Sequence, residues 1–366
     1  MAALVESYVQ TVTGPAAAVE RRARNRPRAH ELLKLLADKK NILITAHQHP
    51  DPDALASCHA LGTLLAAKLP GAKIVMSVKG RIVSGINEQF IKNSNLSLTP
   101  WDDATLGAYD AVVLLDVQPQ FAYSPLPPGV VPVAVIDHHR SATRRSRMKC
   151  AFCDVRTDAG ATASIVFSYF MELEVTIDPA LAATLLYAIE SDLAGTAGTP
   201  GELDNLALST LTLIADTRRL YQMRYVNLPR AYYQAFFTGM ANATYYGRAI
   251  ISHIGEIDTV EKPAVMADSL LRFDQVDWAL VSAIYEGKFV LSIRTRDPKL
   301  SAADMARKLL SRIGEGGGHR TKAGGFIAMK ENTVAEVDRI RRSLVRRYLK
   351  VLNIKDVRGQ RLVEAT

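Results

Sequence analysis

The chain has few cysteines and no long apolar run, and both absences narrow its class. Only three cysteines occur in 366 residues, too few for a disulfide scaffold, which fits a reducing compartment. Cys150 and Cys153 form a CxxC pair, but no second pair of Cys or His lies near them. We therefore expect a structural role for this pair rather than a zinc site. No apolar stretch reaches the roughly 18 residues that a membrane-spanning helix needs, so we expect no membrane segment.

The N-terminal stretch also lacks the features of a secretory signal. Glu6 interrupts its first apolar run, and no basic segment comes before that run. This predicts a cytoplasmic protein. There is no internal repeat and no low-complexity tract, and a single core rarely grows beyond about 250 to 300 residues. A chain of 366 residues is therefore expected to form two domains.

The formal net charge of +8 favours polyanionic partners without identifying one. We interpret the basic cluster of the last helix as a solvated helix face, and the middle cluster as a loop close to a candidate site. The three clusters are Arg21, Arg22, Arg24, Arg26 and Arg28; Arg144, Arg145 and Arg147; and Arg339, Arg341, Arg342, Arg346 and Arg347.

Apolar strands alternate with helical stretches in the first half of the chain. The segments NILITA, KIVMSV, DAVVLLD and VPVAVID are apolar almost throughout, which predicts an α/β fold with a mostly parallel, doubly wound sheet covered on both faces. A helical region follows, and then a smaller α/β unit containing a Gly-rich loop. The expected division is a first domain over 1–204 with a helical extension over 1–38, a helical linker over 205–246, and a second domain over 247–366.

Clusters of Asp and His follow three of these strands. Ligands collect at the carboxyl ends of parallel strands, and a buried carboxylate is costly unless a positive charge pairs with it. A mixture of carboxylates and imidazoles suits Mn²⁺ and, less well, Mg²⁺. The candidate ligands are His47, Asp51, Asp53, Asp116, His138 and Asp192, with Asp137 and His139 beside them.

Two metal ions about 3.5 to 4 Å apart can lower the pKa of a bound water from 15.7 to about 7 and stabilise the attacking and leaving oxygens of an in-line displacement. Such a pair favours phosphoester hydrolysis over acyl transfer. A serine nucleophile is a weaker alternative, because neither Ser57 nor Ser141 lies in a GxSxG setting.

Four segments resemble the motifs of the DHH phosphoesterase superfamily: ITAHQHPDPDALAS, VVLLDVQ, AVIDHHRS and YAIESDLAGT. That superfamily includes RecJ-like exonucleases, nano-RNases with pAp phosphatase activity, cyclic-dinucleotide phosphodiesterases and family II pyrophosphatases. The segments SIRTRDPKLSAADMARKL and GEGGGHRTKAGGF resemble the DHH-associated domain of its nuclease branch. The resemblance implies a catalytic domain over 1–204 and a substrate-binding domain over 247–366.

The resemblance also implies a role for each candidate residue. Asp116 would bridge two divalent ions. His139 would touch the scissile phosphate or protonate the leaving oxygen, with Asp137 orienting a histidine. One ion would be held by His47, Asp51 and Asp116, and the other by Asp53, Asp116, His138 and Asp192. In the second domain, the glycines allow close backbone approach to an anion. The implied substrate-binding residues are Arg294, Gly316, Gly317, Gly318 and His319.

The motifs depart from the superfamily pattern in two places. Pro52 and Ala56 stand where small glycines are usual, and Pro52 fixes its own φ, which can shift the loop. Val117 and Gln118 follow Asp116 where other polar residues are usual. We expect these departures to affect substrate preference more than metal binding.

The implied activity is hydrolysis of short oligonucleotides, linear dinucleotides or pAp to mononucleotides. Two divalent ions would assist, Mn²⁺ foremost and Mg²⁺ as the alternative, and the resemblance allows a homodimer. The partners would be short RNA or DNA oligonucleotides or nucleotides. The alternatives are a pyrophosphatase or exopolyphosphatase, and a catalytically weak nucleotide- or RNA-binding protein.

Overall fold

The computed structural model describes residues 28–80, 82, 85–140, 149–193, 200–355 and 358–363. The extension before residue 28, with Arg21, Arg22, Arg24 and Arg26, and the loop arginines Arg144, Arg145 and Arg147 lie outside these ranges. The described residues pack into two compact units. Unit 1 holds them up to Val226, except Ile82 and residues 85–86. Unit 2 holds these exceptions and the described residues from Asn227 onward.

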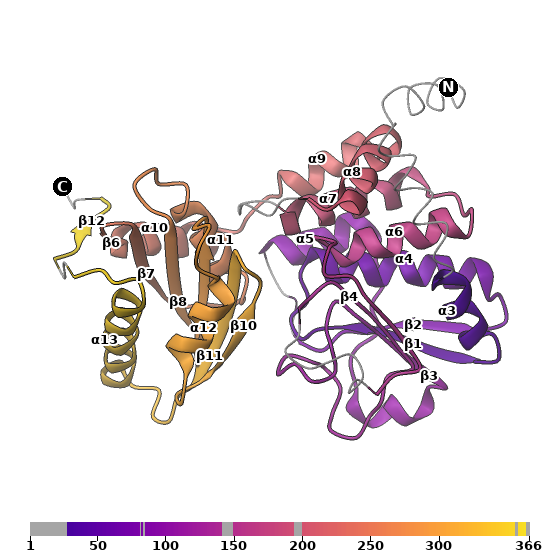
Figure 1. The fold of residues 1–366 in the computed structure, drawn as a ribbon, viewed down its shortest axis with the longest axis horizontal. Helices are drawn as coiled ribbons and strands as arrows, with labels where there is room; N and C mark the ends of the chain where they lie inside the picture. The colour runs from indigo at the N-terminus through magenta and orange to yellow at the C-terminus, as the bar shows by residue number, and fades with distance from the viewer. Residues whose placement is uncertain are drawn as a thin grey trace. The chain divides into compact units, whose positions relative to one another are not determined.

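Unit 1 is built on a five-stranded sheet in the order β2-β1-β3-β4-β5 (Figure 1). Every neighbouring pair is parallel, which confirms the expected sheet. The central strands are buried on both faces, which accounts for their apolar sequences. The strands are β1 (Asn41–Ala46), β2 (Lys73–Met76), β3 (Ala111–Leu115), β4 (Ala134–Asp137) and β5 (Phe152–Val155).

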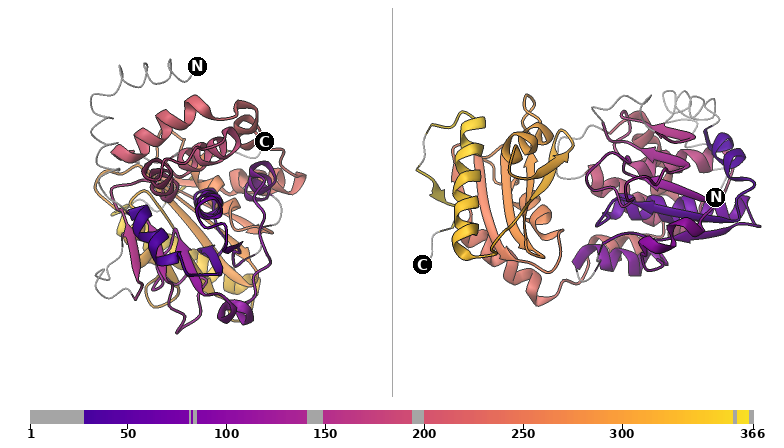
Figure 2. Two further views of the ribbon diagram at one scale, coloured as in Figure 1. Left: turned by 90° about the vertical axis from the view of Figure 1, so that its right-hand side faces the viewer. Right: turned by 90° about the horizontal axis from the view of Figure 1, so that it is seen from below.

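Helices cover one face of this sheet (Figures 1 and 2). Helices α4 and α6 pack on the strands, α7 lies against both, and α8 and α9 lie against α7. The helices of unit 1 are α3 (Arg28–Leu36), α4 (Pro52–Lys68), α5 (Gly85–Ser94), α6 (Thr162–Glu172), α7 (Pro179–Leu193), α8 (Glu202–Ile214) and α9 (Thr217–Arg224).

The other side of the sheet has irregular cover. Leu43 and Val112 pack there against Leu106 of the 3-10 helix η1 (Asp103–Ala108) and against side chains of the 126–130 loop. Leu114 packs with residues of the 121–126 segment. Beside the sheet, the sulfurs of Cys150 and Cys153 are bonded to each other.

Unit 2 contains a seven-stranded sheet in the order β10-β11-β9-β8-β7-β6-β12. Its neighbours are antiparallel except for the parallel pair β7 and β8. One core joins the sheet to α10 and α11, and another joins it to α12 and α13. The strands are β6 (Thr244–Tyr246), β7 (Ala249–Glu256), β8 (Trp278–Tyr285), β9 (Lys288–Thr295), β10 (Glu315–Gly318), β11 (Lys322–Ala328) and β12 (Gln360–Arg361).

The helices of unit 2 are α10 (Arg230–Asn242), α11 (Lys262–Leu270), α12 (Ala302–Leu310) and α13 (Val334–Val351). In the segment 205–246, α8 and α9 therefore pack in unit 1, whereas α10 packs on β7 in unit 2. The Gly-rich stretch expected to be a loop is instead strand β10, paired with β11. None of the helices in the described ranges has the length and apolar character needed to cross a membrane.

Candidate metal centre

The loop after β1 is held in place by its neighbours. The backbone N–H of Gln48 donates to the Tyr123 carbonyl (2.9 Å), and its side-chain Nε2 donates to the Ser124 carbonyl (2.9 Å). Asn87 Nδ2 donates to the Pro50 carbonyl (3.1 Å). These bonds fix the backbone on both sides of His49, so the side chains of the loop start from a defined position.

Asp51 and Pro52 begin helix α4. The Asp51 carboxylate accepts the N–H of Ala54 (3.1 Å) as the N-cap, and Pro52 occupies the first helical position. Proline is favoured there, because its fixed φ suits the helix and its missing N–H would have no partner in the helix. Pro52 therefore continues directly into the helix.

Asp53 connects α4 to α6. Its two carboxylate oxygens accept the backbone N–H groups of Thr162 and Ala163, each at 2.8 Å. The N-cap residue of α6, Ala161, has no side chain that can do this. Asp53 is 1% exposed and its charge lies at the positive end of α6, which stabilises the carboxylate.

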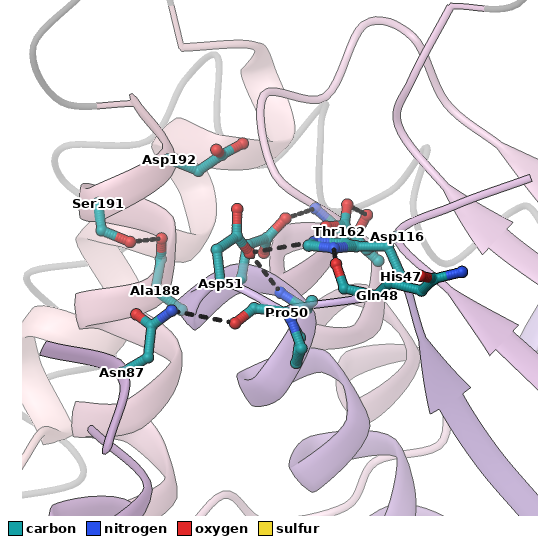
Figure 3. Close-up of polar contacts among 12 residues, drawn as sticks. His47, Gln48, Pro50, Asp51, Asn87, Asp116, Thr162, Ala188, Ser191 and Asp192 are labelled. Carbon is teal, nitrogen blue, oxygen red and sulfur yellow. Dashed lines mark hydrogen bonds and ion pairs between the residues drawn. The ribbon is translucent and has the colours of Figure 1, made fainter. Parts of the chain in front are cut away.

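Asp116 follows β3 in a left-handed conformation with φ of 56°. Such a backbone is uncommon for a residue other than glycine and concentrates at functional sites. Its two carboxylate oxygens face different imidazoles: Oδ2 lies 3.5 Å from His47 Nε2, and Oδ1 lies 3.4 Å from His138 Nε2. Thr162 Oγ1 donates to Oδ1 as well (2.8 Å). Figure 3 shows His47, Asp51, Asp116 and Thr162 gathered in one place.

The first group of donors is His47, Asp51 and Asp116. His47 Nε2 lies 3.8 Å from Asp51 Oδ1. His47 Nδ1 lies 2.9 Å from the Gln48 carbonyl, a contact that assigns the ring proton to Nδ1. The lone pair of Nε2 then points at the carboxylates, which is the usual arrangement of a metal-binding imidazole.

The second group gathers around His138. His138 Nε2 lies 4.0 Å from Asp53 Oδ2 and 3.6 Å from Asp192 Oδ2, besides its approach to Asp116. Asp192 comes from the end of α7, far along the chain from the three strand ends. The structure thus brings all six predicted ligands into two groups that share Asp116.

The distances in both groups fit a metal ion better than direct hydrogen bonds. Ligand atoms that bind a small divalent ion at about 2.1 Å, with ligand–metal–ligand angles of roughly 90 to 110°, lie about 3.0 to 3.5 Å from one another. The imidazole-to-carboxylate distances here run from 3.4 to 4.0 Å, whereas a charge-assisted hydrogen bond is about 2.7 to 2.9 Å long. Four carboxylates and two imidazoles also match the hard divalent ions in chemistry.

The electrostatics of the cluster point the same way. Burial raises the pKa of Asp53 well above its usual value, and the charge of Asp116 raises it further. Burial opposes ionisation of Asp116 too, but the neighbouring imidazoles of His138 and His47 hold its pKa well below the usual range. Burial lowers the pKa of His138, yet Asp116 and Asp53 outweigh it and raise that pKa to about 9. The cluster therefore favours positive charge at its centre, which a divalent cation supplies.

Asp137 lies beside Asp116, within 4.8 Å of it, and binds His139. Its Oδ1 lies 2.7 Å from His139 Nδ1, and its Oδ2 accepts a hydrogen bond from Gln118 Nε2 (2.6 Å). Gln118 Nε2 also lies 2.9 Å from the His139 carbonyl, and Gln120 Nε2 donates to Gln118 Oε1 (2.7 Å). The departure after Asp116 thus produces a buried amide that holds both Asp137 and the backbone of His139.

Sequence reasoning did not identify Gln118 and Thr162. In the sequence, Gln118 is only a departure from the usual motif. A glutamine two positions past a strand-end Asp is a weak signal of a role beside the metal cluster. Thr162 begins an apolar helix after Gly160 and Ala161, and nothing in that pattern relates it to Asp116. Only the packing of α6 beside β3 and β4 does so.

The predicted substrate-binding residues of unit 2 have structural partners of their own. Arg294 Nε donates to Asp268 Oδ1 (2.6 Å), and Arg294 Nη1 donates to Ser292 Oγ (2.8 Å). These two bonds use several of the N–H groups of the guanidinium. A Cβ on Gly318, whose φ is +145°, would lie 2.5 Å from the Lys322 carbonyl oxygen, whereas one on Gly317 would meet nothing within 4 Å. The His319 N–H donates to the same carbonyl (2.7 Å) and closes the β10–β11 turn.

The carboxyl ends of the parallel strands thus gather carboxylates and imidazoles into groups that could hold metal ions. Comparison with known proteins makes this specific: residues 41–189 match the family described as "DHH family, N-terminal domain". This matched part of the chain is similar to the DHH family, and it contains the triplet Asp137, His138 and His139.

Two further similarities extend beyond that domain. An uncharacterized protein of Methanocaldococcus jannaschii is 28% identical over 304 residues, which cover 82% of this chain but 61% of the relative. The chain thus spans less than two thirds of that relative's length. The crystal structure of an exopolyphosphatase-related protein from Bacteroides fragilis has the same fold, with a TM-score of 0.65 at 17% identity over 90% of this chain and 98% of that one.

Proposed function

We propose that this protein is a two-metal phosphoesterase that releases mononucleotides from short oligonucleotides, linear dinucleotides or pAp. The observation that carries the proposal is the orientation of Asp116, whose two oxygens face two separate groups of donors. A carboxylate placed in this way can bridge two cations. One would be held by His47, Asp51 and Asp116, and the other by Asp53, Asp116, His138 and Asp192. Mn²⁺ suits this mixture of imidazoles and carboxylates best, with Mg²⁺ as the alternative.

When bound, the two ions supply an acidified water and stabilise the charge of the phosphate. The protein's own contribution centres on His139. Its contact with Asp137 assigns the ring proton to Nδ1, so Nε2 is the nitrogen that exchanges a proton with the leaving oxygen. Gln118 holds Asp137 and the His139 backbone in place. Asp137 therefore orients His139.

We assign binding of the substrate's other phosphate or base to unit 2. Gly317 has room around its Cα, and the side chain of His319 follows it at the turn. Arg294 lies directly across from Lys322 on the neighbouring strand, which places two cations at one end of the β9–β11 pair. Together these residues offer donors and positive charge for an anionic ligand.

The test is Mn²⁺-dependent hydrolysis of a substrate panel: pAp, linear pApA, cyclic di-AMP, a short RNA, a long single-stranded DNA, pyrophosphate and polyphosphate. Mononucleotide release from pApA or the short RNA is the expected result. Asp116→Ala is the control, and it should abolish turnover while the thermal unfolding transition remains cooperative. Turnover unchanged in Asp116→Ala would refute the two-metal assignment.

A second candidate is an exopolyphosphatase, which the similarity to the exopolyphosphatase-related protein from Bacteroides fragilis favours. Both reactions use the same metal chemistry, so the two differ in what unit 2 recognises. Preferred hydrolysis of polyphosphate over pApA would establish this alternative. Tight nucleotide binding without turnover of any substrate would instead indicate a binding protein.

A further inference from the structure

Helix α13 carries four exposed basic side chains along one line. Arg339, Arg342, Arg346 and Lys350 follow one another at intervals of three, four and four residues, and all four are exposed. At 3.6 residues per turn these positions share one face of the helix, and at 1.5 Å per residue they extend over roughly 16 Å. We call these four residues the α13 stripe.

The opposite side of α13 is built into the core of unit 2. Leu344 and Tyr348 are buried against the sheet, where Tyr348 meets the Trp278 ring edge to face at 6.2 Å. Figure 2 shows α13 lying over one face of that sheet. Most apolar side chains of α13 pack in this way, although Val334 at its first position is exposed, and the stripe itself presents cationic groups to solvent.

Little negative charge neutralises the stripe. Arg339 lies 3.5 Å from Glu336, but no carboxylate among the described residues forms an ion pair with Arg342, Arg346 or Lys350. The other two arginines of α13 are held internally: Arg341 by Asp338 (3.2 Å) and Arg347 by the Leu309 carbonyl (2.8 Å). Arg341 and Arg347 therefore have protein partners, whereas the side chains of the stripe extend into solvent.

The surroundings add further positive charge. Helices α12 and α13 contain eight basic and three acidic residues, a net charge of +5 in a chain whose total is +8. Exposed, uncompensated charge of one sign attracts polyanions over long range. The concentration on two neighbouring helices makes this a local property of unit 2 and not an average over the chain.

We propose that the α13 stripe binds the phosphate backbone of a single-stranded nucleic acid. A flexible strand can follow a straight row of cations, whereas each strand of a duplex winds away from it. The stripe has no aromatic side chain on which bases could stack, so binding is independent of sequence and strongly salt-dependent. A lipid surface fits less well, because a helix that lies in a membrane needs an exposed apolar face, and α13 buries its own.

This inference deepens the proposed function, since the stripe would retain strands that extend beyond the residues cleaved. Its binding step does not require cleavage. The experiment therefore uses the full-length protein in EDTA, where hydrolysis cannot proceed, and measures the affinity for a fluorescent DNA strand of about 24 nucleotides across a salt series. The stripe variant is R339Q/R342Q/R346Q/K350Q.

The matched control is K34Q/K40Q/K73Q/R218Q, which removes four exposed cations from unit 1. Each phosphate contact contributes about 0.7 to the slope of log K against log salt for a single strand, so the stripe variant should lose up to about three units of slope and at least about ten-fold in affinity. The control should lose much less. Hydrolysis of pApA should match wild type in both variants.

Equal losses in the two variants would overturn the inference, because binding would then follow total charge. It would also be overturned if the stripe variant kept its DNA affinity but lost binding to phosphatidylserine vesicles. A wild-type protein that binds DNA through the stripe but cleaves neither pApA nor the short RNA would refute the proposed function and leave this inference standing.

Discussion

The candidate sites of the two units differ in how much of them the fold itself explains. In unit 1, Asp116, His138 and Asp192 are buried, and their charged groups lie 3.4 to 3.6 Å apart, too far for strong hydrogen bonds. The hydrogen bond from Thr162 to Asp116 accounts for only part of this buried charge. In unit 2, Gly318 is required by the backbone of the β10–β11 turn, and Arg294 is bound to Asp268.

This difference shows when a sequence motif is good evidence for a functional site. Where a costly set of residues has no structural reason, a ligand is the economical explanation. Where each residue has a structural reason, the same motif needs a separate functional test. The predictions below test the candidate metal cluster of unit 1 first and residues of unit 2 afterwards.

The largest effect is expected from His47→Gln, with His49→Gln as the matched control in the same loop. Loss of a metal ligand removes several kcal/mol of transition-state stabilisation, so kcat/KM for pApA should fall at least about a thousand-fold. Mn²⁺ affinity, measured by calorimetry, should fall with it. The His49 variant should stay within a few-fold of wild type. Similar losses in both variants would mean that the loop matters as a whole and that His47 is not a specific ligand.

Gln118→Met should have the next largest effect. It keeps the side-chain volume but removes the hydrogen bonds to Asp137 and His139, and outer partners of this kind are worth about 10 to 100-fold in activity. The loss should appear in kcat, with a changed pH profile and unaltered Mn²⁺ affinity. If the variant only unfolds at a lower temperature, Gln118 has a structural role alone.

Arg294→Ala tests whether unit 2 binds the substrate. If the guanidinium also contacts an anion, KM for pApA should rise about ten-fold, the equivalent of about 1.4 kcal/mol, and a small chromogenic phosphodiester should be spared. His319→Ala should behave in the same way. Asp268→Ala removes the structural partner of Arg294 and serves as the control. Equal losses for both substrates would show that these residues do not hold the nucleotide.

Gly318→Ala and Gly317→Ala compare two neighbouring glycines of one strand. Alanine at 318 would be forced into a left-handed backbone and against the Lys322 carbonyl, and should lower the free energy of unfolding by about 1 to 3 kcal/mol. Alanine at 317 should change it by less than about 0.5 kcal/mol. Chemical denaturation measures both. A large loss of stability at 317 would contradict the packing described for the turn.

The smallest effect is expected from Asp297 in acid. Backbone N–H groups, Trp278 and Arg248 overcome the burial of this carboxylate and lower its pKa to about 2. A carboxylate with a lowered pKa stabilises the fold above its unfolded-state pKa of about 3.9, and this contribution is lost as the pH falls towards 2. Asp297→Asn should therefore be less stable than wild type at neutral pH, with the difference shrinking between about pH 4 and pH 2. A constant difference would assign the effect to something other than its charge.

Much of unit 1 was predictable because its signals are local. The strands of the parallel sheet are apolar enough to be recognised singly, and their alternation with helices predicted that they run parallel. The candidate metal ligands stood out because Asp and His after apolar strands are costly without a partner. Unit 2 was predicted less well: a run of glycines indicates a loop in sequence, whereas the pairing of β10 with β11 turns it into a strand.

The sequence by itself determined which chemistry is present: the carboxylates and imidazoles at the strand ends, the glycines of the second unit and the excess of basic residues. Only the tertiary structure decided how these groups meet. It showed that the two oxygens of Asp116 face different histidines, that Gln118 holds Asp137, and that three arginines and one lysine of α13 form one exposed stripe. The physical reason is that side-chain type and periodicity are local properties of the sequence. The distances between segments far apart in the chain are set by tertiary packing.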